Sequence, residues 1–225
     1  MLTIGHRGAS AYKPENTLSS FQKAIELGAD MIELDVHRCK TGEIVVIHDF
    51  TLGRTTSGKG LVKTKTLEQL KSLNIKKEEK IPTLQEVLDL VHHCIKINIE
   101  LKGKKTAQPV LALIDEYVLH RGWDYNDFLI SSFDYTQLQE IRKLNTTLKI
   151  GVLWARFPLR WLQKALAVHA YSVHSLYSKT TLKLVEKAHQ HNLKVFVWTV
   201  NQKKDIEKMK TMGVDGIISN HPDLI

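Results

Sequence analysis

Short apolar runs alternate with amphipathic segments along almost the whole chain of 225 residues. Nine runs have the composition of buried strands, at residues 3–7, 31–35, 44–48, 96–101, 128–131, 149–153, 171–174, 194–198 and 215–218. Amphipathic segments lie between most of them, for example at residues 83–93, 110–120 and 182–191. This alternation is typical of an α/β fold with a parallel sheet and crossover helices. Because eight strands close such a sheet best, we predict a TIM-type (β/α)8 barrel, with one run of unknown position outside it.

The connections between the expected strands differ in kind. The first contains a turn at residues 14–16, where Asn16 occupies the position of a helix N-cap, and Gly28 follows the expected helix. Residues 36–43 are too few for a crossover helix, so this connection must be a coil or a hairpin. Residues 51–81 interrupt the alternation and contain three glycines. We therefore predict one unit over residues 1–225, with a small insertion at about residues 50–82 on the active-site side.

Charge and composition limit the classes of partner. The formal net charge is +8, and residues 50–82 contain eight Lys or Arg against three Glu. We interpret this excess as a lysine-rich solvated surface; the alternative is an entrance that attracts anionic substrates. Because the chain has no zinc-finger spacing and no basic stripe interleaved with aromatic residues, we expect no nucleic-acid partner. No motif predicts an oligomeric state.

Nothing in the sequence indicates secretion or a membrane anchor. No run of 18 apolar residues is present, so we expect no transmembrane segment. The first expected strand begins at once, without the basic and apolar regions of a signal peptide. Cys39 and Cys94 lie far apart and lack C-x-x-C spacing, so we expect unpaired thiols. These features together predict a cytoplasmic protein.

Three carboxylates stand at or near the ends of expected strands. Glu33 and Asp35 are two residues apart in one strand, so both side chains leave it on the same face, and Glu100 follows the same pattern in another strand. Gathered in the mouth of a barrel, they would repel one another and raise their pKa values unless a cation neutralised them. Oxygen-only ligands suit a hard ion, so we predict a site for one divalent metal ion, Ca²⁺ or Mg²⁺.

Two histidines, an arginine and a lysine accompany these carboxylates. His6 and His48 end expected strands, and histidine titrates near neutral pH, so we expect them to share the roles of general base and general acid. Arg7 and Lys102 suit recognition of a phosphate group. His37, on the strand face of Glu33 and Asp35, and His174, at a later strand end, are further candidates for the site. The whole set predicts metal-assisted cleavage of a phosphate ester.

An ordered set of motifs resembles the glycerophosphodiester phosphodiesterase family over nearly the whole chain. The motifs are H-R-G-A-S-A-Y-K-P-E-N-T (6–17), E-L-D-V (33–36), V-I-H-D (46–49), R-T-T-S-G-K-G (54–60), I-P-T-L-Q-E-V-L (81–88), E-L-K (100–102), S-S-F (131–133), W-T-V-N (198–201) and G-V-D-G-I-I-S-N (213–220). In the last motif the family more often has Asp where this chain has Asn220. The missing signal peptide makes the chain similar to the family's cytosolic members.

The resemblance implies a TIM-barrel hydrolase that cleaves substrates such as glycerophosphocholine or glycerophosphoethanolamine into sn-glycerol 3-phosphate and an alcohol. It implies Glu33, Asp35 and Glu100 as metal ligands, His6 and His48 as the acid–base pair, Arg7 and Lys102 as phosphate contacts, and Trp198 as a pocket wall against glycerol. Neither the motifs nor the resemblance decides which histidine is the base. They also leave open whether water or the glycerol 2-hydroxyl attacks the phosphorus atom.

Three other interpretations remain open at this point. A lysophospholipase D would need an apolar groove, for which Phe50, Leu52, Leu61 and Val62 of the expected insertion are candidates. A catalytically silent barrel used as a binding module should have lost a histidine or carboxylate, and all five are present. A binder of anionic surfaces rests on the net charge alone.

Overall fold

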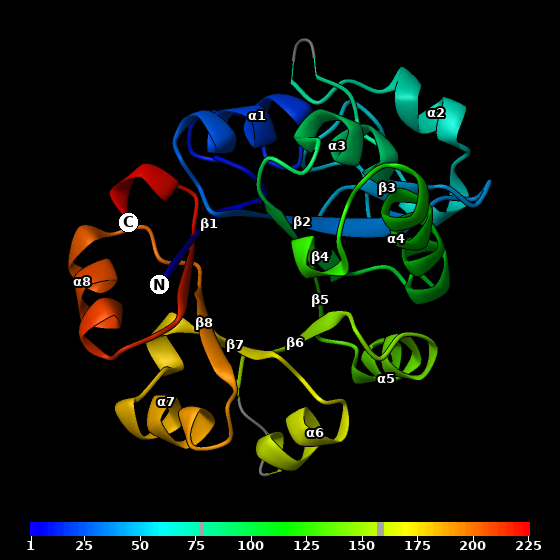
Figure 1. Cartoon of the computed structure of the whole chain (residues 1–225). Helices are drawn as coiled ribbons and strands as arrows, with labels where there is room; N and C mark the ends of the chain where they lie inside the picture. Colours follow the sequence, from blue (N-terminus) through cyan, green and yellow to red (C-terminus); the bar gives the residue numbers. More distant parts are fainter. Residues whose placement is uncertain (77–78, 157–159) are drawn as a thin grey trace.

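The computed structural model describes residues 1–76, 79–156 and 160–225 (Figure 1). Eight parallel strands form its centre: β1 (Leu2–His6), β2 (Met31–Arg38), β4 (Lys96–Leu101), β5 (Phe128–Ser132), β6 (Lys149–Trp154), β7 (Ser172–Leu176), β8 (Lys194–Trp198) and β9 (Gly216–Ser219). Each strand pairs with its neighbours in the order β1-β9-β8-β7-β6-β5-β4-β2, and the pairing of β1 with β2 closes the sheet. The prediction of a TIM barrel is therefore confirmed.

The remaining strand lies outside the barrel. β3 (Ile44–Val46) pairs antiparallel with the last three residues of β2, so that Val36 stands opposite Val46. The six residues of β2 up to Val36 pair in parallel with β4. The run at residues 44–48 is therefore the ninth one, and the connection too short for a helix is a hairpin.

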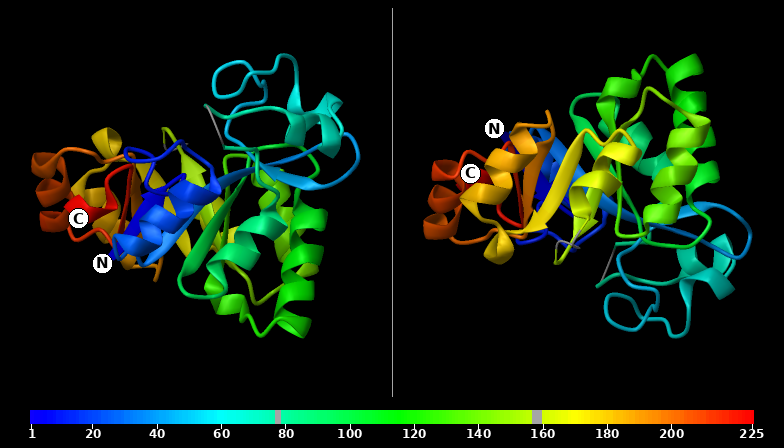
Figure 2. Two further views of the ribbon diagram at one scale, coloured as in Figure 1. Left: turned by 90° about the horizontal axis from the view of Figure 1, so that it is seen from above. Right: turned by 90° about the horizontal axis from the view of Figure 1, so that it is seen from below.

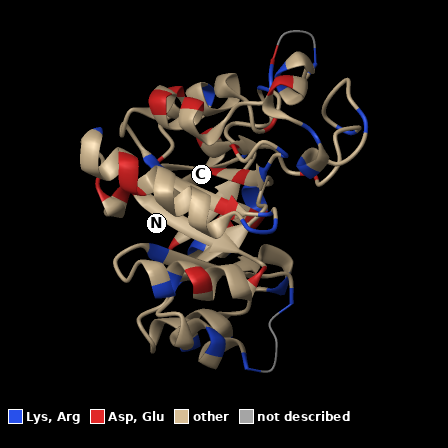
Figure 3. Cartoon of the chain, turned by 90° about the vertical axis from the view of Figure 1, so that its right-hand side faces the viewer, with Lys and Arg blue, Asp and Glu red and all other residues tan. Residues whose placement is uncertain are grey.

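Eight α-helices are found in the described part of the chain: α1 (Leu18–Glu26), α2 (Leu67–Ser72), α3 (Leu84–Val91), α4 (Ala107–His120), α5 (Tyr135–Leu144), α6 (Trp161–Ala167), α7 (Leu182–His189) and α8 (Lys203–Thr211). Short 3₁₀ turns are η1 (Val62–Thr64), η2 (Tyr125–Asp127), η3 (Tyr177–Lys179) and η4 (Pro222–Leu224). Most helices surround the barrel. The segment between β3 and α3, which contains α2 and η1, projects away from the barrel (Figures 1 and 2). Lysines and arginines are spread over many elements, with acidic residues between them (Figure 3).

The segment between β3 and α3 packs on an apolar cluster that includes Leu52, Val62, Leu70 and Ile81, all fully buried. Residues 77–78, which fall in this segment, lie outside the described residues. The division of the chain into one barrel unit with an insertion at about residues 50–82 stays our proposal, supported by this separate cluster.

The cap of α1 differs from the expectation. Thr17, not Asn16, is the N-cap: its Oγ1 accepts the N–H of Ser20, and the Ser20 hydroxyl accepts the N–H of Thr17. Asn16 adopts a left-handed backbone conformation with φ of +57°, which aims its side chain at Asp35 on β2. Gly28 follows the helix with φ of +76°, as predicted.

Alternation along the strands separates two sets of side chains. On β2, Ile32, Leu34 and Val36 pack outward in the cluster that the helices share, which confirms the expected orientation of this strand. A second cluster, Ile4, Met31, Leu129, Phe196 and Ile218, comes from the same strand face as the carboxylates and is buried inside the barrel. We call this cluster the apolar plug. It lies on the amino-terminal side of the carboxylates, since Met31 precedes Glu33 and Asp35 on the same face of β2.

Candidate active site

The three carboxylates that the sequence singled out lie side by side at the carboxyl end of the barrel. β1, β2 and β4 are neighbours, and their registers place His6 opposite Glu33 and Asp35 opposite Glu100. The three acidic side chains are buried, and each offers an oxygen atom within 4.8 Å of the others. The structure therefore brings together residues that are up to 67 positions apart in the sequence.

Burial makes this carboxylate cluster costly to ionise. Burial and the charge of Asp35 raise the pKa of Glu33 well above its ordinary value, and the same causes raise the pKa of Glu100 to about 7. Lys102 Nζ lies 3.2 Å from Glu100 Oε1, and Arg7 Nε lies 3.4 Å from Asp35 Oδ2. A hard divalent cation such as Ca²⁺ or Mg²⁺ suits an oxygen-only donor set of this kind. Such a cation therefore fits the cluster, whose negative charge it would balance.

His48 does not end a barrel strand, although the sequence suggested a strand end for it. β3 ends at Val46, and His48 lies two residues later, close to the barrel because the Ile47 N–H donates to the Asp35 carbonyl at 2.9 Å. The ring of His48 contacts Asp49 Oδ1 through Nδ1 at 2.6 Å and Lys102 Nζ through Nε2 at 3.1 Å. Since an ammonium group only donates, Nε2 accepts and Nδ1 carries the proton. Nε2 is thus the basic atom of the ring.

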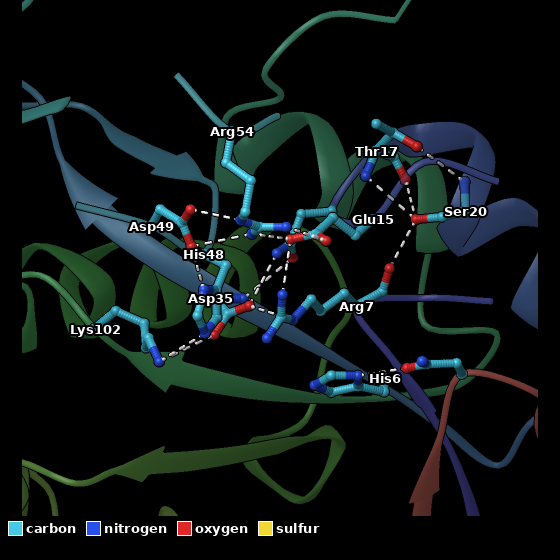
Figure 4. A network of polar contacts seen from close by, with 12 residues as sticks. His6, Arg7, Glu15, Thr17, Ser20, Asp35, His48, Asp49, Arg54 and Lys102 are labelled. Atoms are coloured by element: carbon cyan, nitrogen blue, oxygen red, sulfur yellow. Dashed lines mark hydrogen bonds and ion pairs between the residues drawn. The ribbon is translucent and has the colours of Figure 1, made fainter. Parts of the chain in front are cut away.

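A chain of ion pairs connects His48 to the first barrel loop (Figure 4). Arg54 Nε contacts Asp49 Oδ2 at 2.6 Å, and Arg54 Nη2 contacts Glu15 Oε1 at 2.7 Å. Arg7 Nη1 contacts the same Glu15 oxygen at 2.7 Å. Although burial opposes it, hydrogen bonding to Arg54 and the charge of Arg7 lower the pKa of Glu15 to about 2. The hydrogen bond from Arg54 likewise lowers the pKa of Asp49, so both acids are ionised at neutral pH.

His6, at the end of β1, has a neutral partner. Its Nδ1 lies 2.6 Å from Asn220 Oδ1, an acceptor, so Nδ1–H donates and Nε2 keeps its lone pair. Burial and the positive charge of Arg7 lower the pKa of His6 to about 4, although the Asn220 hydrogen bond raises it. His6 is therefore a neutral imidazole at pH 7, with Nε2 available to accept a proton.

One cavity joins these groups, and of the eight residues predicted for metal, catalysis or substrate binding all except Asp35 line it. Trp198 lines it from the end of β8, with its ring 5.6 Å from that of Phe133 and perpendicular to it. His174 also lines the cavity. His37 does not; its Nε2–H instead donates to the His48 carbonyl at 3.1 Å and so supports the backbone of His48.

Reasoning from the sequence missed four polar residues of the site. Asn16 donates to Asp35 Oδ2 at 2.9 Å and accepts the Asp35 N–H, so it orients this carboxylate. Glu15 and Arg54 carry the chain of ion pairs, and Asn98 lines the cavity. The first three occur inside the quoted motifs, but a motif alone does not show which residues pair across 39 positions.

Comparisons with known proteins agree on one family. The model of the glycerophosphoryl diester phosphodiesterase family matches residues 6–224. A glycerophosphodiester phosphodiesterase from Caldanaerobacter subterraneus subsp. tengcongensis is 42% identical over 235 aligned residues, which cover 100% of this chain and 96% of the relative. The structure of an Oleispira antarctica phosphodiesterase in complex with the product sn-glycerol 3-phosphate has a TM-score of 0.91 at 28% identity, covering 99% of this chain and 94% of that one. A glycerophosphodiester phosphodiesterase from Thermotoga maritima has a TM-score of 0.82 at 29% identity, covering 100% and 96%.

A closed eight-stranded barrel with a polar cavity at the carboxyl ends of its strands defines a TIM-barrel enzyme. The chain belongs to the glycerophosphoryl diester phosphodiesterase family, as the motifs indicated. In the described part of the chain, no helix is long and apolar enough to cross a bilayer.

Proposed function

We propose that the protein hydrolyses glycerophosphodiesters, such as glycerophosphocholine and glycerophosphoethanolamine, to sn-glycerol 3-phosphate and an alcohol. One observation carries the proposal: three buried carboxylates within 4.8 Å of one another share a cavity with two histidines, an arginine and a lysine. The family match and the product found in the Oleispira antarctica relative support the same reaction.

Glu33, Asp35 and Glu100 are the proposed ligands of one divalent ion, Ca²⁺ or Mg²⁺. Such an ion, when bound, supplies Lewis-acid stabilisation of charge that grows on the phosphate. The side chain of Asn16 holds Asp35 in place through two hydrogen bonds, and the Arg7 N–H donates to Glu33 Oε2 at 2.9 Å. These contacts orient two of the three ligands before any ion binds.

His6 and His48 are the proposed acid–base pair. Each ring has its Nδ1–H held by an oxygen atom, of Asn220 and of Asp49, so a proton is transferred at Nε2. In His48 this atom accepts from Lys102 Nζ, a contact that Lys102 must give up when it binds the phosphate. One histidine, unprotonated at Nε2, removes a proton from the nucleophile, and the other, which must first gain a proton at Nε2, gives it to the departing alcohol. Attack by water gives sn-glycerol 3-phosphate directly, whereas attack by the glycerol 2-hydroxyl gives a cyclic phosphate that water then opens. Arg7 and Lys102 are proposed to bind the phosphate. Replacing either histidine with alanine should lower kcat by roughly 10²–10⁴-fold, and near-normal turnover would remove that residue from the mechanism.

The test of the function is release of sn-glycerol 3-phosphate from glycerophosphocholine by the purified protein. It is run with a chelator and then with added Ca²⁺ or Mg²⁺, for the wild type and for Glu100→Gln. Glu116→Gln is the matched control, because Glu116 is exposed on α4, away from the cavity. We expect release that depends on the metal and disappears only in Glu100→Gln. No release with either ion would contradict the proposal.

A second candidate function is hydrolysis of lysophospholipids. Of the four apolar residues proposed for a groove, Leu52 and Val62 are buried, whereas Phe50 and Leu61 are exposed. The exposed pair lines a groove together with His37 and Lys63, next to the carbonyl of His48. This groove favours the second function, and comparing lysophosphatidylcholine with glycerophosphocholine as substrates separates the two.

A cytoplasmic location is also part of our proposal. Both cysteines, Cys39 and Cys94, carry free thiols, which suits a reducing compartment. The proposed partner is a small glycerophosphodiester substrate, and we propose no nucleic-acid partner. Retention on DNA that falls as the salt concentration rises would contradict the last point.

A further inference from the structure

The groove beside the catalytic cavity combines an apolar wall with a basic rim. We call it the side groove; it is lined by His37, Arg38, Phe50, Leu61, Lys63, Gly103 and Lys104. His37 connects it to the active site, because His37 Nε2–H donates to the His48 carbonyl at 3.1 Å and the His37 ring meets that of Phe50 with 4.9 Å between the ring centres. None of the described residues that line the side groove is acidic.

A short backbone ribbon carries the apolar wall. The Val62 N–H donates to the Phe50 carbonyl at 3.0 Å, and the Leu52 N–H donates to the Gly60 carbonyl at the same distance. Leu52 and Val62 are fully buried and anchor the ribbon, whereas Phe50 is 55% exposed and Leu61 is 40% exposed. The chain therefore holds two large apolar side chains in fixed positions and leaves them open to a contact outside the protein.

The rim consists of three cations, Arg38, Lys63 and Lys104, which are all exposed. None of them forms an ion pair with an acidic residue in the described part of the chain. By contrast, Lys194 on another face lies 2.9 Å from Asp215 Oδ1. The side groove thus gathers positive charge that the protein does not neutralise, and such charge attracts an anionic partner.

Close backbone packing fixes the part of the rim that follows β4. The Gly103 N–H donates to the Val36 carbonyl at 3.0 Å, and a Cβ atom on Gly103 would lie 2.9 Å from His37 Cα. Only glycine allows the chain to pass so close to the end of β2. Lys104 is therefore held beside the apolar wall by the backbone that precedes it.

The apolar wall and the basic rim together select the kind of partner. An anionic bilayer offers a negatively charged surface to the three cations and an apolar boundary to Phe50 and Leu61. A nucleic acid or a small anion would pair with the cations but leave the two apolar side chains in water. The combination is typical of a peripheral contact with lipid, in which apolar side chains enter the interface and cations meet the head groups.

We propose that the side groove docks the protein on the surface of an anionic phospholipid bilayer. Phe50 and Leu61 enter the interface, and Arg38, Lys63 and Lys104 contact the phosphate groups. The contact needs no membrane-spanning helix, and it holds the catalytic cavity beside the lipid. The inference concerns where the protein binds rather than what it hydrolyses, so it does not rest on the proposed function.

The experiment measures sedimentation of the full chain with two kinds of vesicle, one of phosphatidylcholine alone and one of equal parts phosphatidylcholine and phosphatidylglycerol. One variant, Phe50→Ser with Leu61→Ser, removes the apolar wall. The other, Lys63→Gln with Lys104→Gln, removes two cations of the rim. The melting temperature of each variant shows whether it folds.

Matched controls make the same chemical changes away from the side groove. Leu119→Ser alters a side chain of α4 that is 71% exposed. Lys203→Gln with Lys204→Gln removes two exposed lysines of α8. Both controls keep the side groove intact and should bind vesicles within about twofold of the wild type, since charge acts on a surface only over about a Debye length.

We expect the wild type to bind the anionic vesicles, to bind less as the salt concentration rises, and to leave the neutral vesicles free. Loss of Lys63 and Lys104 should weaken binding about 25-fold, because each cation near an anionic surface contributes about fivefold. Loss of Phe50 and Leu61 should weaken it about tenfold. A wild type that stays in solution, or equal losses in the controls, would overturn the inference. Binding that DNA displaces and that Phe50→Ser with Leu61→Ser does not weaken would also overturn it, in favour of a polyanion surface.

Hydrogen exchange of the wild type decides the question if the variants do not fold. Amide exchange is measured with and without the anionic vesicles. Slower exchange at residues 50–63 and 103–105 in the presence of vesicles supports the inference. Protection confined to other parts of the chain, or no protection, refutes it.

Discussion

The neutral partner of His6 allows one substitution with a calculable effect. His6 Nδ1 lies 2.6 Å from Asn220 Oδ1, and burial with the charge of Arg7 lowers the pKa of His6 to about 4. Asn220→Asp keeps the size and the hydrogen bond but adds a negative charge at this contact. The protonated ring is then stabilised, so the pKa of His6 must rise.

The contact distance sets the size of this rise. With charge centres about 4 Å apart and an effective dielectric constant of about 20, the attraction is roughly 4 kcal/mol, or about three pKa units as an upper limit. Neighbouring opposite charges shift pKa values by about 1–3 units, so we expect the His6 pKa in Asn220→Asp to lie at about 5–7.

The assay is an NMR titration of the imidazole signals of metal-free protein, with His6→Gln to assign the signal. Asn126→Asp, an exposed position far from the site in η2, serves as the matched control. A His6 pKa that does not change in Asn220→Asp would refute the electrostatic reasoning. The pH–rate profile of the same variant then assigns the role of His6. If His6 is the base, the acid limb of kcat/KM moves to higher pH; if it is the acid, activity at neutral pH increases.

Three further predictions follow from the contacts of the site. Ca²⁺ or Mg²⁺ at 100 times its Kd should stabilise the wild type by about 2.7 kcal/mol and raise its Tm, measured by calorimetry, by roughly 5–10 °C. A similar rise in Tm for Glu100→Gln would argue against the carboxylate cluster as the binding site. Arg54→Met removes the contacts to Asp49 and Glu15, so His48 should be misplaced and kcat/KM should fall about tenfold. Because Arg54 is largely exposed, the free energy of unfolding should change by less than about 1 kcal/mol. Unaltered steady-state kinetics would count against this role of Arg54. His174 has a folded pKa of about 3 against about 6.5 unfolded, so the unfolded state binds more protons between these values and stability is lost as pH falls below about 6.5. Urea unfolding should show this as a loss of about 2.7 kcal/mol at pH 4.5 that is missing in His174→Leu, and equal pH dependence in the two proteins would contradict it.

The barrel and the carboxylate cluster could be predicted because their signals are local. Glu33 and Asp35 share one strand face by simple alternation, and Glu100 needs only a neighbouring parallel strand in register. The extra strand could not be identified, since Ile44–Val46 is as apolar as the barrel strands and only its antiparallel pairing with β2 excludes it. The short connection at residues 36–43 indicated a coil or a hairpin, but it did not show which of the two runs that it joins lies outside the barrel.

Residues whose roles depend on backbone conformation or on partners across the barrel were also beyond prediction. Asn16 has the composition of a helix cap, but its left-handed conformation turns it toward Asp35 and passes the cap to Thr17. Asn98 is a single polar residue in an apolar strand, and nothing near it in sequence shows that it faces the cavity, whereas His174, a candidate from its place in a later strand, does line it.

Because β2 pairs with both β4 and β3, this one strand sets the positions of the site residues on both sides of it. Its first six residues align Glu33 and Asp35 with β4, and its last three align β3, from which His48 follows after Ile47. Insertions or deletions within the paired residues 36–38 and 44–46, or at Ile47, would change the spacing of His48 from the carboxylates, whereas length changes in the turn at residues 39–43 or after Arg54 leave that spacing intact. Length variation during evolution is therefore expected in this turn and after Arg54, and chimaeras that exchange the residues after Arg54 should keep the relative positions of His48 and Asp35.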